Sequence, residues 1–384
     1  MEDIWFTSAI WIGLALLASL ISIRVALSVA LVEIVVGAVA GNLIDLATTD
    51  WINYLAAVGA VLLTFLAGAE IDPMVIRRNL VSTMTIGVVG FFAPYLGVLA
   101  YALAVLDWPW PQAQIAGISL STTSVAIVYA VMIETGYNRT ELGKIILAAC
   151  FINDVGTVLA LGLVFANYNV WLVLFAVATG VAMWLLPKFV PWFFRSVGNR
   201  VSEPETKFVL LILFALGGFA ATAKSEAVLP AYLIGMVLAP FFLADKVLAN
   251  RIRVMTFTLL TPFYFLKAGS LVKLDTIVAS AGLICVFLAV KIATKLAILP
   301  LTYAFRFGGR RGMYTTMLMS TGLTFGSISA LFGYTNGIIN QDQYTVLVTA
   351  VIGSAVVPTL IAQRWFQPRF DPVESEARKE KTHV

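Results

Sequence analysis

Long apolar segments, separated by short stretches that carry charges, proline or glycine, make up most of the 384-residue chain. An α-helix needs about 20 apolar residues to cross the hydrocarbon core of a bilayer. By this criterion the pattern predicts thirteen transmembrane helices, at residues 4–23, 25–46, 52–70, 81–105, 112–134, 140–166, 169–187, 207–223, 228–243, 253–271, 276–305, 311–333 and 343–363. The expected fold is therefore an all-α polytopic membrane protein.

Composition supports this prediction and excludes several classes of site. Apolar side chains make up 60% of the chain and charged ones 12%, whereas soluble proteins are about half apolar and about a quarter charged. The two cysteines, Cys150 and Cys285, lie inside apolar runs and the single histidine, His383, lies in the C-terminal segment. Disulfides, a zinc site and a histidine proton relay are therefore not expected, and no cofactor is predicted.

The distribution of positive charge predicts an orientation and a domain organisation. Most of the 25 lysines and arginines fall in alternate loops, which places the N-terminus outside and the C-terminus in the cytoplasm. The first apolar run follows acidic residues, so it is expected to be a retained helix rather than a signal peptide. The inner segment 187–207 is expected to be a connecting loop or an amphipathic segment on the membrane surface. Residues 1–367 form the predicted membrane domain, and 368–384 a short disordered tail.

A carboxamide and a carboxylate, Asn153 and Asp154, lie at the middle of the predicted helix 140–166. A carboxylate at this depth is costly, which marks it as functional; the alternative is a packing carboxylate paired with a lysine. We expect Asp154 to bind either H⁺ or a monovalent metal cation, Na⁺ or K⁺, because the two compete for one negative charge. Asn153 adds a neutral carbonyl oxygen to the predicted site.

Two predicted helices, 112–134 and 311–333, are rich in hydroxyl groups at membrane depth. Serine and threonine can donate to the preceding turn of their own helix, which would leave both helices continuous. Two interrupted helices that run in opposite directions are, however, typical of transporters built from inverted repeats, whose site lies at the middle of the membrane. The candidate break residues are Thr122, Ser320, Thr321, Gly322 and Gly326, and the hydroxyl groups expected at the ion are those of Thr123 and Ser124.

Two lysines and one further acid also lie inside apolar runs. Lys291 and Lys295 are four residues apart and share one face of the predicted helix 276–305. At least one of them is expected to compensate charge at Asp154 or at the helix ends, and the sequence does not decide which. Glu33 is expected to pack against protein beside two nearby glycines rather than to bind an ion.

Together these residues resemble the monovalent cation/proton antiporter family of the sodium/hydrogen exchanger type. The matching segments are 33–41, 65–72, 122–125 and the Asn153-Asp154 pair. The resemblance implies a core domain, mainly residues 81–166 and 276–363, with the other helices serving as scaffold, dimerisation and linking elements. It also implies a homodimer in the plasma membrane that contributes to pH homeostasis, and an elevator-like motion that carries Asp154 between the two sides.

The predicted function is secondary antiport of Na⁺ or K⁺ against H⁺ by alternating access. A sodium-coupled symporter of an organic anion and a passive channel are the alternatives, whereas an enzyme is not expected because no nucleophile and base pair appears. By resemblance, electrogenic relatives carry two aspartates with a lysine, and electroneutral ones Asn-Asp with an arginine. This chain combines Asn-Asp with lysine, and Ser327 stands where many relatives have a charged residue. Stoichiometry and the choice between Na⁺ and K⁺ stay open.

Overall fold

The computed structural model describes residues 4–25, 28–44, 46, 48–70, 79–135, 137, 140–165, 170–198, 200–223 and 227–368. These residues form helices and connecting segments, with no strand among them, so the all-α prediction is confirmed. The predicted tail from residue 369 onward lies outside the described residues. The helices, in chain order, are α1 (Ile4–Val25), α2 (Val29–Leu43), α3 (Asp50–Ala69), α5 (Leu80–Ala104), α6 (Trp110–Ser121), α7 (Val125–Glu134), α8 (Glu141–Val164), α9 (Val170–Val197), α10 (Pro204–Thr222), α11 (Val228–Ala244), α12 (Lys246–Met255), η2 (Thr256–Leu260), α13 (Thr261–Ser270), α14 (Leu274–Ala279), α15 (Ala281–Lys295), α16 (Ile298–Ala304), α17 (Arg310–Met319), α18 (Thr324–Thr335), α19 (Gln341–Ile361) and η3 (Ala362–Phe366).

Eight helical segments within the described ranges are long and apolar enough to cross a membrane. They are α1, α3, α5, α8, α9, α10 and the composite segments Ala281–Ala304 and Gln341–Phe366; α2 and α11 are apolar but shorter. The other predicted spans are divided between short helices, α6 with α7, α12 with α13, and α17 with α18. The count of thirteen spans therefore stays a prediction, although a helical segment lies at each predicted position.

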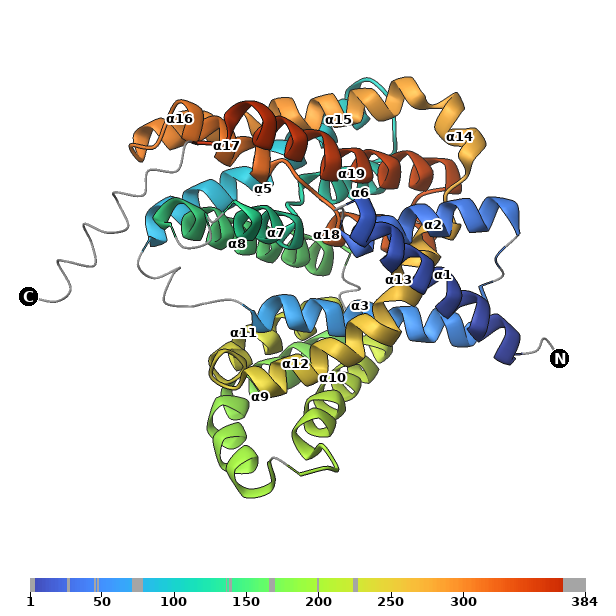
Figure 1. The fold of residues 1–384 in the computed structure, drawn as a ribbon, viewed down its shortest axis with the longest axis vertical. Coiled ribbons are helices and arrows are strands. Elements are labelled where there is room, and N and C mark those ends of the chain that lie inside the picture. Colours follow the sequence, from blue (N-terminus) through green and yellow to red (C-terminus); the bar gives the residue numbers. More distant parts are fainter. Residues whose placement is uncertain are drawn as a thin grey trace, which may run out of the picture.

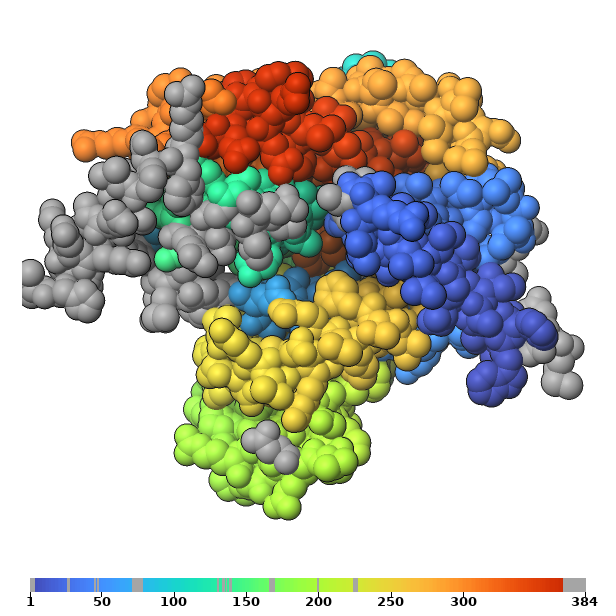
Figure 2. Space-filling view, in the orientation of Figure 1, coloured from blue at the N-terminus to red at the C-terminus, as the bar shows by residue number. Residues whose placement is uncertain are grey.

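Most of the helices gather in two groups in Figure 1, and one hydrophobic cluster with residues of both groups joins them. Helices α5–α8 and α14–α19 lie in the upper part of the view, and α3 and α9–α13 in the lower part, with α9 and α10 projecting furthest. Figure 2 shows the same division, with the orange and red surface of the late helices above the yellow and green surface of the middle ones. Every residue proposed from the sequence as part of the ion site belongs to the upper group.

Reciprocal glycine contacts bring two helix pairs into close approach. A Cβ at Gly37 of α2 would overlap the Leu266 carbonyl of α13, and one at Gly269 of α13 would overlap the Ile34 carbonyl of α2. Helices α3 and α11 meet in the same way. Small residues that let backbones approach are the usual packing device of membrane helices, where lipid offers no hydrophobic advantage to association.

The expectation of a connecting loop across 187–207 is wrong, because α9 continues to Val197 and α10 begins at Pro204, whereas an amphipathic segment on the membrane surface stays a prediction. The prediction treated Pro187 as the end of the helix, but both Pro187 and Pro191 lie inside α9. Side-chain packing explains why the helix continues: Leu186 and Val190 are buried in a cluster with residues of α3, α10 and α11. Neighbouring helices compensate for the hydrogen bonds that a proline removes from a membrane helix.

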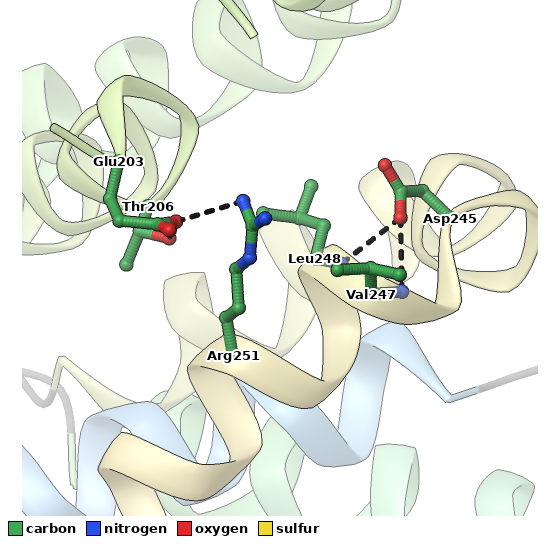
Figure 3. A network of polar contacts seen from close by, with 6 residues as sticks. All are labelled: Glu203, Thr206, Asp245, Val247, Leu248 and Arg251. Carbon is green, nitrogen blue, oxygen red and sulfur yellow. Dashed lines mark hydrogen bonds and ion pairs between the residues drawn. The ribbon is translucent and has the colours of Figure 1, made fainter. Parts of the chain in front are cut away.

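Helix α12 also begins earlier than the predicted helix 253–271. Asp245 caps it, since one carboxylate oxygen accepts hydrogen bonds from Val247 and Leu248 N–H at 3.0 Å each (Figure 3). On the same helix, Arg251 donates to Glu203, which precedes α10, at 3.1 Å (Figure 3). The π-helical turn η2 then joins α12 to α13. This segment is amphipathic at its start, which explains why a search for apolar runs misses its first residues.

Candidate functional site

Helix α8 carries Asn153 and Asp154 near its middle, and both side chains are buried. Thr140 is the N-cap of this helix, and its hydroxyl oxygen accepts a hydrogen bond from Gly143 N–H at 3.1 Å. The Asn153 carboxamide faces α6 and α7: its Oδ1 accepts from Thr123 N–H at 2.9 Å and its Nδ2 donates to the Ser121 carbonyl at 3.3 Å. Asn153 therefore satisfies backbone groups that a helix would otherwise pair internally.

Those backbone groups have no partner within a helix because α6 ends at Ser121 and α7 begins at Val125, with non-helical backbone between them. A second interruption separates α17 from α18, at residues 320–323. The predicted pair of interrupted helices is thus present, and the two interruptions contact each other directly. Thr123 Oγ1 donates to the Met319 carbonyl at 2.8 Å, and Ser124 N–H donates to the Thr321 carbonyl at 3.1 Å. The two breaks therefore satisfy each other's backbone groups.

The candidate break residues lie in different places. Thr122 is in the first interruption, and Ser320, Thr321 and Gly322 are in the second. Gly326, in contrast, lies in the first turn of α18, so it is not a break. A Cβ at this position would come within 2.8 Å of the Ser119 carbonyl of α6, which shows that the glycine allows close approach instead.

Most of these hydroxyl groups also follow the simpler expectation of donation to the preceding turn. Thr122 donates to the Ser119 carbonyl at 3.2 Å, Ser320 to Thr316 at 2.7 Å and Thr321 to Leu318 at 2.8 Å. A hydroxyl that donates in this way keeps lone pairs that can accept from a donor or contact a cation. Interruption and back-bonding therefore occur together at this crossing.

Asp154 is the acid at this crossing, with 2% of its surface exposed. Its Oδ1 has no hydrogen-bond partner, and neither of the ion pairs found in the described part of the chain involves it. Three titratable groups interact with it electrostatically: Lys295 of α15, Tyr232 of α11 and Cys150 one turn earlier on α8. A buried carboxylate without a close partner retains a large desolvation cost, so this oxygen is suited to a proton or a small cation.

Both lysines of α15 are fully buried, and each donates a hydrogen bond beside a different interruption. Lys295 Nζ donates to Thr123 Oγ1 at 3.0 Å, on the side of α6 and α7, and it is the cation that acts on Asp154. Lys291 Nζ donates to Ser354 Oγ of α19 at 2.9 Å, beside Gly322 in the other interruption. The sequence left open which lysine supports Asp154, and this geometry favours Lys295.

Comparison with known proteins decides the class of molecule. Residues 12–367 match the family described as the transmembrane sodium/hydrogen exchanger. The chain belongs to this family. The family consists of ion transporters, which agrees with the expectation that the protein is not an enzyme, and it does not favour the symporter alternative.

Individual exchangers resemble the chain along most of its length. The Na(+)/H(+)-K(+) antiporter GerN of Bacillus cereus is 22% identical over 89% of this chain and 90% of its own. Cation/H(+) antiporter 18 of Arabidopsis thaliana is 23% identical over 82% of this chain and 41% of its own. The solved structure of the sodium proton antiporter MjNhaP1 from Methanocaldococcus jannaschii at pH 8 aligns with a TM-score of 0.70 and 15% identity, covering 94% of this chain and 96% of that one. This last likeness supports the fold.

Some residues of this exchanger site were not anticipated from the sequence. Ser354 is one of several hydroxyl-bearing residues of α19 and nothing in the sequence distinguishes it, and the carbonyl groups of Ser121 and Met319 have no sequence signature. Glu33 is buried on α2, as expected, beside the glycines that pack against α13. The described residues contain no group of three or more His, Cys, Asp or Glu side chains that could hold a metal ion.

Proposed function

We propose that this exchanger performs antiport of Na⁺ or K⁺ against H⁺, and that both ions compete for Asp154. The observation that carries the proposal is a buried carboxylate with an unpartnered oxygen at the crossing of two interrupted helices. In such a place the charged form is costly unless a positive charge lies close to it, and Lys295 acts on Asp154 without forming an ion pair with it. A proton and a metal cation each neutralise it, but one excludes the other. Exchange follows if Asp154 crosses between the two sides only when it is occupied.

The neighbouring residues have distinct roles in this proposal. The hydroxyl groups of Thr123 and Ser124, with backbone carbonyls at the interruptions, are the neutral oxygen ligands for the cation. Asn153 holds the α6–α7 interruption open, through its two hydrogen bonds to the backbone. Lys295 compensates the charge of Asp154 and fixes Thr123. The name of GerN includes both Na⁺ and K⁺, which supports testing both ions.

We also propose that transport proceeds by alternating access through an elevator-like motion. The site residues come from α6–α8, α15 and α17–α19, all in the upper group of Figure 1. In this proposal residues 81–166 and 276–363 move as a core against the remaining helices, which form a homodimer scaffold. The N-terminus faces outward and the C-terminus the cytoplasm of the cell, so that the protein contributes to pH homeostasis across the plasma membrane.

Purified protein in liposomes with an imposed pH gradient tests the function. We expect Na⁺ or K⁺ uptake in exchange for protons, and its loss in Asp154→Asn, because an amide cannot exchange a proton for a cation. Asp275→Asn is the matched control, since it makes the same change at an exposed position of α14. Exchange by Asp154→Asn at the wild-type rate would refute the proposal. Repeating the assay with Na⁺, K⁺ and Li⁺ under a clamped potential reports ion choice and stoichiometry.

A further inference from the structure

A buried lysine side chain of α15 reaches the second interruption. Lys291 is fully buried, and its ammonium group donates to Ser354 Oγ at 2.9 Å. The Ser354 hydroxyl itself donates to the Val351 carbonyl at 2.8 Å and approaches the Gly322 carbonyl at 3.4 Å. Ser354 therefore presents an oxygen lone pair to the ammonium group, as it would to a metal cation.

Gly322 makes this position available. A Cβ added there would overlap Lys291 Nζ, and it would lie 2.9 Å from Thr122 Oγ1 and 3.1 Å from Ser354 Oγ. The ammonium group thus occupies the space that a side chain would take, and it is in hydrogen-bond contact with Ser354 Oγ. A hydroxyl oxygen is also a neutral ligand for a monovalent metal cation, and here the Ser354 hydroxyl accepts from the lysine ammonium group instead.

The two interruptions differ in the charged groups that act near them. The α6–α7 interruption lies beside the carboxylate of Asp154, whereas no described ion pair includes Lys291, and the charged group that acts on it is Lys295, of the same sign. The preceding helix, α17, ends at Met319 with its C-terminal carbonyl groups toward this interruption, whereas α18 begins at Thr324 with its N-terminal N–H groups toward it. A cation near a helix C-terminus is favourable because it faces the negative end of the dipole.

We propose that Lys291 is a positioning residue whose ammonium group acts as a resident cation of the α17–α18 interruption and confines the exchanged cation to the α6–α7 side, at Asp154. This inference rests on the proposed exchange at Asp154 and assigns to Lys291 a role separate from that of Lys295. The resident charge has a second consequence. Because it is positive and close to the site, it weakens the binding of both competing ligands, the metal cation and the proton.

The test compares the cation KM of Lys291→Met with that of wild type in proteoliposomes across a range of pH. At an effective dielectric constant of about 20, a unit charge about 10 Å away changes a binding constant by about tenfold. We expect KM to fall by at least about threefold at the most alkaline pH at which Lys291 still carries its proton, where protons compete least. The difference is expected to shrink at acidic pH, because proton binding strengthens as well. The titratable groups that face Asp154 (Lys295, Tyr232 and Cys150) are unchanged in this variant.

Lys246→Met is the matched control, because it removes an exposed lysine from α12 and is expected to leave KM unchanged. An unchanged KM in Lys291→Met, with only a lower maximal rate, would reduce Lys291 to a packing role and overturn the inference. A changed number of protons per cation would make it a proton carrier and overturn the inference equally. Failure of the proposed function is separate, since it would appear as full exchange by Asp154→Asn.

A double-mutant cycle tests the geometry independently of transport. Gly322→Ala is expected to lower the melting temperature in detergent, because its Cβ and the Lys291 ammonium group cannot occupy one place. Methionine is one heavy atom shorter than lysine, so Gly322→Ala is expected to be better tolerated in the Lys291→Met background. Equal effects of Gly322→Ala in both backgrounds would show that the ammonium group is not at this position. If Lys291→Met fails to fold, Ser354→Ala provides the KM measurement, with a change in the same direction and of smaller size.

Discussion

The hydrogen-bond chain from Lys295 through Thr123 to the Met319 carbonyl is the most direct link between α15 and the two interruptions. Thr123→Val keeps the shape of the side chain and removes the hydroxyl group that accepts from Lys295 at 3.0 Å and donates to Met319 at 2.8 Å. A net hydrogen bond contributes about 1 kcal/mol between neutral groups and about 1.5 to 3 kcal/mol to a charged group. The variant is therefore expected to lose about 2 to 4 kcal/mol of unfolding free energy.

The assay is equilibrium unfolding in mixed detergent micelles, combined with cation exchange in liposomes. Thr123→Ser keeps the hydroxyl group and is expected to stay within about 1 kcal/mol of wild type. Thr85→Val is a second control, because Thr85 makes only a back-bond to the Val81 carbonyl at the surface of α5. A cycle with Lys295→Met isolates the pair, with an expected coupling of about 1.5 kcal/mol or more. A coupling near zero would mean that Lys295 does not depend on Thr123, and the proposed role of this lysine would be refuted.

Three further predictions follow from the same contacts. Asn153→Ala is expected to destabilise the protein by about 2 kcal/mol, because it leaves the Thr123 N–H without its partner, and to reduce exchange by more than tenfold; an active, stable variant would contradict this. Competition at Asp154 is expected to raise the cation KM by up to about tenfold per unit fall in pH, whereas a KM independent of pH would exclude a shared site. Asp245→Ala is expected to cost about 1 kcal/mol through loss of the α12 cap, and Asp245→Ser to restore most of it, as thermal melting in detergent would show.

The positions of the helices were largely predictable, because apolar length is a strong constraint in a membrane. The two interruptions were also predictable, since hydroxyl-rich segments with glycine are costly at membrane depth unless neighbouring groups satisfy them. The errors arose where a local rule was applied without its tertiary context. Pro187 was expected to end a helix, but packing of its neighbours Leu186 and Val190 keeps α9 continuous.

The different hydrogen-bond partners of the two lysines could not be predicted from the sequence. Lys291 and Lys295 share one helix face, and the distinction depends on what lies opposite each of them. Gly322 leaves space for one ammonium group, and Ser354 of α19 supplies its acceptor. The register of α19 against α15 sets that arrangement. The sequences of two apolar helices do not indicate the register in which they pack.

The crossing satisfies most of its own backbone groups, and this property bears on how an ion can be exchanged there. Asn153, Thr123 and the α17–α18 interruption complete one another's hydrogen bonds without an added ion. Asp154 is different, because its unpartnered oxygen retains a desolvation cost, which a proton or a cation removes. In the exchange proposed above, a crossing with one exchangeable charge would let a proton and a cation share one site, because either of them removes that cost.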